Sequence, residues 1–174
     1  ANWNFSSLGP NAAINQSLNL MRGRSRDVAR KNGLADAGLE ILSGHIVGTG
    51  IKPQFATTDM EFNKALAILW DRWTDEADAD AAFDFYGMQA LAVRSMLEAG
   101  DVLCRLRMRR PGDMRTVPLQ LQLLESEYCP IELTRDRIMQ GIEFNGIGQK
   151  TAYWLYRNHP GDMNFNFSTS MIPY

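Results

Sequence analysis

The segment of residues 85–110 constrains the fold most, because its apolar pattern changes period at a single glycine. Up to Ala99 the apolar residues recur at helical spacing and leave few polar positions, which predicts a helix that is covered on more than one side. Gly100 follows, and glycine readily adopts the left-handed backbone that ends helices. Beyond it, polar and apolar residues alternate as in a strand. The segment therefore predicts a helix that turns directly into a strand, which is the start of an α+β core.

The predicted strand after Gly100 has two unlike faces. The apolar face, which we assign to the core, consists of Val102, Cys104, Leu106 and Met108. The other face carries a row of arginines, Arg105, Arg107 and Arg109. Three interpretations of this row remain open: a solvated strand face, a contact with a subunit or partner, and a contact with phosphate.

Helical spacing of apolar residues predicts three further helices before this segment. The first starts near Ala12 and ends at residues 32–33, and the second follows directly and ends at Gly48. The third begins after an N-cap at Thr58 or Asp59. The apolar side of the second helix consists of Leu34, Ala37, Ile41, Leu42 and then His45 or Ile46.

Strand patterns dominate the second half of the chain. Residues 117–124 alternate and predict a strand that pairs antiparallel with the one after Gly100. Residues 138–144 and 151–157 predict a hairpin, because asparagine and glycine in the connection supply the positive φ that such turns need. The expected fold class is α+β, with three to four helices packed on a mainly antiparallel sheet.

Length and composition indicate one globular unit. The 174 residues are 45% hydrophobic, which is enough for one core and short for two domains. We expect an N-terminal arm over residues 1–11, an α+β domain over residues 12–157 and a tail over residues 158–174 that continues in a longer polypeptide. No run of about 18 apolar residues indicates a membrane span.

Charge is nearly balanced overall but segregated along the chain. The net charge of −2 argues against a basic protein that coats nucleic acid. Residues 22–31 are basic, and residues 71–84 are acidic and are expected to form a solvated loop. These two regions suit a head-to-tail contact between copies of the chain. The candidate subunit-interface residues, with the arginine row included, are Arg22, Arg24, Arg26, Arg30, Lys31, Asp75, Asp78, Asp80, Arg105, Arg107 and Arg109.

Residues that carry chemistry are sparse. The two histidines and two cysteines do not have the close spacing of zinc ligands, so we expect no metal site and no cofactor. The glycines around Gly48 lack the Lys-Ser/Thr that follows a phosphate-binding loop. No serine has the sequence context of a hydrolase nucleophile. We therefore expect a structural or assembly role and no enzymatic activity.

Several short stretches occur together in the order found in one family of viral proteins. The chain resembles the lambda-type portal proteins of tailed bacteriophages. The stretches that carry the resemblance are RSRD at residues 24–27, IVGTGI at 46–51, WDRW at 70–73, LAVRS at 91–95, EAGDV at 98–102, VPLQL at 117–121, GIEF at 141–144, AYWL at 152–155 and HPGD at 159–162.

The resemblance implies a subunit of a ring of twelve copies at one capsid vertex, in a virion assembled in the host cytoplasm. Double-stranded DNA passes through the ring during packaging and ejection. The implied partners are capsid and scaffold proteins, the terminase packaging motor, and head-completion and tail proteins, with no membrane. The region matched is part of the wing, whereas the stem, clip and crown lie outside it. The alternative is a nucleic-acid-binding or nucleic-acid-processing domain, which predicts strong salt-dependent DNA binding or metal-dependent hydrolysis.

Overall fold

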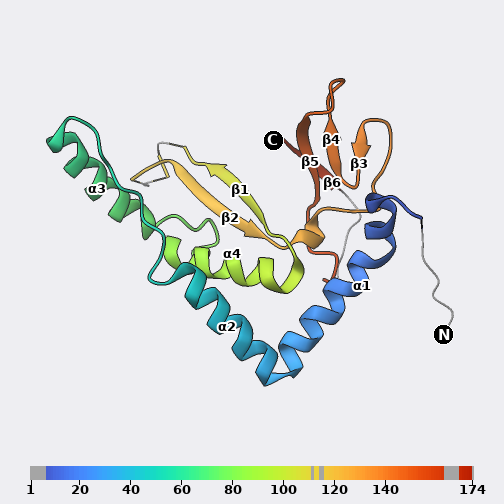
Figure 1. Cartoon of the computed structure of the whole chain (residues 1–174). Helices are drawn as coiled ribbons and strands as arrows, with labels where there is room; N and C mark the ends of the chain where they lie inside the picture. The colour runs from blue at the N-terminus through green and yellow to red at the C-terminus, as the bar shows by residue number, and fades with distance from the viewer. Residues whose placement is uncertain (1–6, 111, 114–115, 163–168, 174) are drawn as a thin grey trace. The chain divides into compact units, whose positions relative to one another are not determined.

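A computed structural model describes residues 7–110, 112–113, 116–162 and 169–173, and Figure 1 shows its helices and strands. Contacts within the chain divide it into two compact units. Unit 1 consists of residues 1–24 and 126–174, and unit 2 consists of residues 25–125. The described residues form four α-helices and two antiparallel sheets, which confirms the α+β fold class. The predicted arm, single domain and tail stay a prediction.

The first two helices follow each other with one residue between them. Helix α1 spans Pro10–Lys31, and α2 spans Gly33–Val47. Asn32 separates them as the N-cap of α2, because its side-chain oxygen accepts hydrogen bonds from the backbone N–H groups of Leu34, at 3.0 Å, and Ala35, at 3.4 Å. This arrangement confirms the predicted end of the first helix and start of the second. None of the described helices is long and apolar enough to cross a membrane.

Helices α3 and α4 of unit 2 begin and end at the predicted signals. Helix α3 spans Met60–Thr74 and has Asp59 as its N-cap, whose carboxylate accepts the backbone N–H of Glu61 at 3.0 Å. Helix α4 spans Phe85–Ala99. It ends at Gly100, whose φ of 94° is the left-handed conformation expected from the sequence.

The sheet of unit 2 has β2 at its centre. Strand β1 spans Leu103–Met108 and pairs antiparallel with β2, which spans Leu119–Leu124. On the other side of β2, Leu121 donates its N–H to the carbonyl of Ala77 at 2.7 Å and accepts the N–H of Ala79 at 2.8 Å. Ala77 is fully buried. The prediction of a solvated acidic loop was therefore wrong for this part, since residues 77–79 complete the sheet.

A buried glutamine ties these three segments together. Gln120 of β2 is 2% exposed. Its amide nitrogen donates to the carbonyls of Glu76, at 2.7 Å, and Asp78, at 2.9 Å. Its amide oxygen accepts the Nε–H of Arg109 at 2.7 Å. The side chain thus satisfies its hydrogen-bonding groups at a position where an unpaired polar group would be costly.

The core of unit 2 lies where the end of α3, the start of α4 and β2 meet. Trp73, Ala77 and Met88 are its buried residues. Around them pack the partly buried side chains of Trp70, Phe85, Val117, Leu121 and Leu123. The aromatic rings lie 5.1 to 5.2 Å apart in tilted and edge-on pairs, which are favourable geometries. Trp73 also donates its indole N–H to the carbonyl of Leu119 at 2.8 Å, which holds α3 against β2.

The prediction that the apolar side chains of β1 lie in the core was wrong, although they share a sheet face with the core leucines of β2. Leu106 is 65% exposed and Met108 is 76% exposed, and Cys104 of the same face is exposed too. The arginines are half-buried, and Arg107 donates to the side-chain oxygen of Gln122 at 3.1 Å. The reason is that the helices cover β2 rather than β1, so the apolar core takes leucines of β2 and leaves those of β1 outside.

Unit 1 contains a four-stranded antiparallel sheet in the order β3-β4-β5-β6. Its strands are β3, Ile138–Met139, β4, Ile142–Phe144, β5, Lys150–Tyr156, and β6, Thr169–Pro173. The connection of β4 and β5 confirms the predicted hairpin, with Asn145 donating its N–H to the carbonyl of Gln149 at 2.9 Å. The predicted first strand of this hairpin is interrupted at Gly141, where a Cβ atom would lie 2.7 Å from the sulfur of Cys129.

The first part of α1 belongs to unit 1 and contacts its sheet. Gln140 donates its side-chain N–H groups to the carbonyl of Asn11, at 3.1 Å, and to the side-chain oxygen of Asn15, at 2.7 Å. Among the strand residues of this unit whose burial is described, Ile138, Ala152, Leu155 and Tyr156 are the buried apolar ones. The hydroxyl of Tyr156 donates to the Glu132 carboxylate at 2.6 Å.

The position of the unit 2 core predicts opposite outcomes for two leucines. Leu121→Asp should unfold unit 2 or destabilise it by at least about 2 kcal/mol, because it places a charge against the buried aromatic rings. Leu106→Asp should cost less than about 0.5 kcal/mol, because its side chain is already solvated. Urea denaturation followed by circular dichroism measures both. Because the two leucines are cross-strand partners on one sheet face, equal destabilisation would contradict the conclusion that the core covers β2 and not β1.

The Tyr156 hydrogen bond predicts a loss of stability in alkali. Burial, together with the hydrogen bond and charge of Glu132, raises the pKa of Tyr156. The folded chain therefore holds this proton more tightly than the unfolded chain, so the contribution to stability is complete below pH about 10 and is lost as the pH rises further. Tyr156→Phe should melt earlier at pH 8 but show a smaller drop in melting temperature between pH 8 and pH 11. An unchanged pH dependence would exclude this role.

Candidate subunit interface

Arg94 of α4 joins that helix to α2. Its guanidinium lies 2.5 Å from the carboxylate of Asp36 and also pairs with Glu40, one helical turn further along α2. The hydrogen bond to Asp36 raises the pKa of Arg94, and the charges of Asp36, Glu40 and Glu98 add to this against the lowering effect of burial. These are the two carboxylates of α2. Both are therefore engaged on the side of α2 that faces α4.

A second set of ion pairs lies beside the first. Arg26 contacts the carboxylate of Glu125 at 2.7 Å and that of Glu98 at 4.0 Å. These side chains, together with Arg30, Asp36 and Arg94, line a cavity of about 360 Å³ in unit 2. Three arginines face three carboxylates there, so the lining has no excess charge to attract an ion of either sign. The arrangement is suited to holding the helices together.

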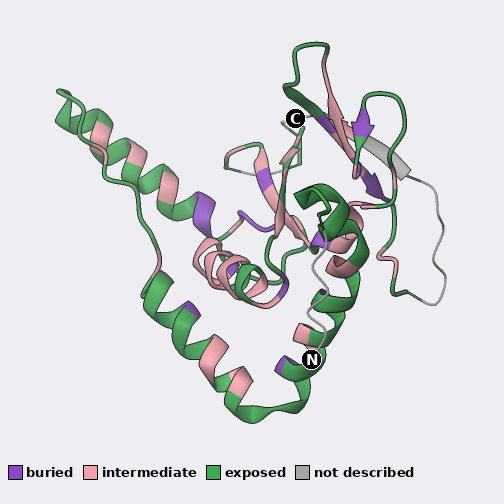
Figure 2. Ribbon diagram, turned by 45° about the vertical axis from the view of Figure 1, so that its right-hand side comes forward, coloured by how far each residue is buried: buried purple, intermediate pink, exposed green. Residues whose placement is uncertain are grey.

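The outer face of α2 is apolar and exposed. Leu34 is 87% exposed and Ile41 is 59% exposed, and Leu42 and Ile46 are exposed as well. Figure 2 shows most of α2 in the colour of exposed residues. Because the carboxylates of α2 turn toward Arg94, this face carries no acidic residue and no lysine or arginine. The residues identified as the apolar side from the sequence are thus directed away from the core of unit 2.

Helix α3 exposes a second apolar stripe. Phe62, Ala65 and Leu69 follow one another at helical spacing, and Phe62 is 52% exposed. The opposite side of this helix meets the preceding extended segment, where Asn63 donates its side-chain N–H to the carbonyl of Thr57 at 3.0 Å. Residues 53–57 thus cover one side of α3 and leave the stripe exposed.

The structure places the predicted basic residues in different environments. Arg22 is buried, and Arg26 belongs to the ion pairs described above. Arg24 and Arg30 are exposed. Lys31 is exposed and pairs with Asp27 on the same helix at 2.6 Å. Arg24 and Arg30 are therefore the arginines of this group that are most accessible to another subunit.

The predicted acidic residues also differ in accessibility. Asp75 and Asp80 are exposed, and Asp80 accepts the side-chain N–H of Gln122 at 3.0 Å. Asp78 is buried, and its carboxylate accepts the backbone N–H groups of Asp80, Ala82 and Phe83 at 2.9 to 3.0 Å. The loop thus uses Asp78 for its own folding, whereas Asp75 and Asp80 lie at its surface.

The arginine row, in β1 and at the residue that follows it, lies on the same face of the two-stranded sheet as Gln120 and Gln122, opposite the β2 leucines that meet the aromatic core. Arg105, Arg107 and Arg109 are all half-buried. Arg107 and Arg109 donate to glutamine side chains of β2. A role for this row in contacts between subunits stays a prediction.

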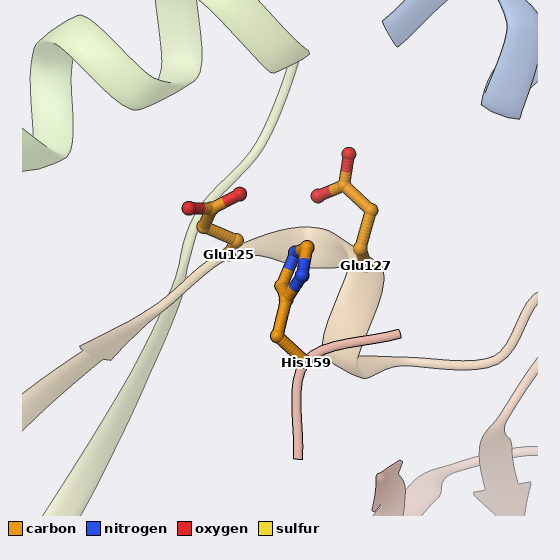
Figure 3. Close-up of side chains that lie close together, drawn as sticks. All are labelled: Glu125, Glu127 and His159. Carbon is orange, nitrogen blue, oxygen red and sulfur yellow. The ribbon is translucent and has the colours of Figure 1, made fainter. Parts of the chain in front are cut away.

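Glu127 and His159 of unit 1 lie close together, which the sequence did not indicate because 31 residues separate them. Their side-chain ligand atoms are within 4.8 Å of each other, and Figure 3 draws both with Glu125, the last residue of unit 2. The His159 ring also lies edge-on to Tyr128, with 5.5 Å between centroids, and its Nδ1 accepts the N–H of Gly161. The two donors of unit 1 are fewer than the three protein ligands of a typical catalytic zinc site.

The chain belongs to the lambda family of phage portal proteins. Its sequence matches the family described as "Phage portal protein, lambda family" over residues 1–173. It is also similar to a probable portal protein of the Halomonas phage phiHAP-1, with 22% identity over 156 residues. That match covers 82% of this chain but 30% of the relative, so the chain spans less than a third of the relative's length. The resemblance seen in the short stretches is confirmed.

The Arg94 ion pairs predict a measurable contribution to the stability of unit 2. Arg94→Met should lower the free energy of unfolding by about 1–2 kcal/mol, since it leaves two carboxylates of α2 without their cation. Arg72→Met, at an exposed position of α3, is the matched control and should change stability by less than about 0.5 kcal/mol. Thermal denaturation of both variants provides the comparison. Equal melting temperatures would show that the pairs do not hold α2 to α4.

Proposed function

We propose that this chain is part of a structural subunit of the portal ring at one capsid vertex of a tailed phage. The family match over residues 1–173 carries this proposal. The family is structural, and the name of the Halomonas phage relative agrees with a portal role. In this role the ring forms the passage through which double-stranded DNA enters the capsid and leaves it. No catalytic step is assigned to the chain.

The proposal extends to the partners of such a ring. Twelve copies form the ring, which contacts capsid and scaffold proteins during assembly in the host cytoplasm. The terminase packaging motor docks on it, and head-completion and tail proteins replace the motor in the virion. The near-neutral charge of this chain supports a position in the wing rather than along DNA, because phosphate contacts require lysine or arginine side chains.

Exposed charges support a contact between neighbouring subunits. Arg24 and Arg30 are accessible on α1, and Asp75 and Asp80 are accessible on the acidic loop. Opposite charges on two different surfaces of one chain suit a head-to-tail arrangement, in which each copy presents both surfaces. Arg26 is left out of this contact because it already pairs with Glu98 and Glu125.

The ring proposal is tested by electron microscopy of the complete phage-encoded polypeptide. Purified wild-type protein should form rings with a central hole. The change Arg24→Glu should reduce ring formation at low salt while the melting temperature is retained, since this side chain is exposed. Arg72→Glu is the matched control and should form rings normally. Failure of the wild-type protein to form rings would contradict the proposed function.

The same preparations distinguish the alternative of a nucleic-acid-binding domain. Binding of this chain to double-stranded DNA should be weak at 150 mM salt, because it has two more acidic than basic residues. Tight binding with a steep salt dependence, or hydrolysis of DNA after addition of a divalent metal, would favour the alternative.

A further inference from the structure

Unit 2 exposes two apolar faces on different helices. The α2 face consists of Leu34, Ile41, Leu42 and Ile46. The α3 stripe consists of Phe62, Ala65 and Leu69. Both belong to the same compact unit, and Figure 1 shows them on separate helices. Soluble proteins rarely leave contiguous apolar patches exposed unless the patches bind something.

We propose that the α2 face of one copy packs on the α3 stripe of the neighbouring copy in the portal ring. This inference rests on the proposed ring function and names the surfaces that would join its subunits. A ring built head to tail needs two different, complementary patches on every copy. A patch that bound its own equivalent would instead close a dimer. Two unlike apolar faces on one unit therefore fit a ring contact.

The charges beside these faces are complementary. The exposed basic residues Arg30 and Lys31 end α1, one residue before α2, and Lys31 also pairs with Asp27. Helix α3 and its two caps carry four acidic residues, Asp59, Glu61, Asp71 and Asp75, against Lys64 and Arg72. A basic border next to one apolar face thus meets an acidic border next to the other. This pattern of an apolar centre with a charged rim is typical of specific interfaces and favours a second copy as the occupant.

The internal ion pairs explain why the α2 face, which also carries the exposed His45, has no carboxylate. Asp36 and Glu40 are both held by Arg94 on the side of α4. Either carboxylate on the outer face would be buried without a cation when the next subunit docks, which is strongly unfavourable. The pairing therefore stabilises unit 2 and keeps the docking face apolar.

Two double variants of the complete phage-encoded polypeptide test the contact. The α2 variant carries Leu34→Glu and Ile41→Glu, and the α3 variant carries Phe62→Glu and Leu69→Glu. Each should remain folded, because the changed side chains are exposed. Each should weaken self-association at least about 100-fold, since the new charges stay unpaired in the contact. The matched control, Ile147→Glu, changes a 79% exposed isoleucine of unit 1 and should leave ring formation unaltered.

Mixing the two variants separates a head-to-tail contact from other arrangements. An α2 variant still has an intact α3 stripe, and an α3 variant still has an intact α2 face. The mixture should therefore give heterodimers in analytical ultracentrifugation but no closed rings, whereas each variant alone stays monomeric. Normal rings from either variant, or no heterodimer in the mixture, would overturn the inference while wild-type rings leave the proposed function standing. If wild-type protein forms no rings, the proposed function itself fails.

Discussion

The pairing of Arg94 with two carboxylates of α2 is the interaction on which the surface of unit 2 depends. A helix that is apolar on nearly all sides has no strong preference for which side faces the core. Asp36 and Glu40 lie one turn apart, so a single guanidinium on α4 holds both and fixes the rotation of α2 about its axis. The side opposite the two carboxylates then becomes the outer surface. The ion pairs of Arg94 thus determine which side of α2 forms the exposed apolar face.

Which strand the helices cover also determines which residues of the unit 2 sheet are buried. Strand β2 has β1 along one edge and residues 77–79 along the other, and the aromatic core covers its leucines. Strand β1 lies at the edge and receives little of this coverage. Arg107 of β1 and Arg109 after it donate hydrogen bonds to glutamines of β2, and the apolar residues Leu106 and Met108 remain exposed. The row of arginines therefore contributes to hydrogen bonding within unit 2 and is not only a surface feature.

Local sequence signals predicted most helices and strands, whereas the burial of individual side chains in the tertiary structure was harder to predict. Gly100, the Asp59 cap and the Asn145 turn each act through the backbone of a few residues, so their effects follow from sequence. Alternation along β1 correctly indicated two faces but not that the core covers the apolar face only at β2, because that depends on where α3 and α4 pack. The burial of Asp78 was equally unpredictable, since it requires three N–H donors from later in its own loop. The order of short stretches was sufficient to identify the family, although each stretch alone is common.

Gln120 shows how a polar residue can restrict variation more than its apolar neighbours do. Its amide meets two carbonyls from the segment beside β2 and Arg109, which follows β1. Leucine or methionine has a similar volume but would leave all three groups without this partner. The leucines around it can exchange for one another at low cost, as apolar cores generally allow. Among related phages, we expect evolutionary drift to change the leucines of β2 more freely than this glutamine, which makes position 120 the more informative marker of this sheet.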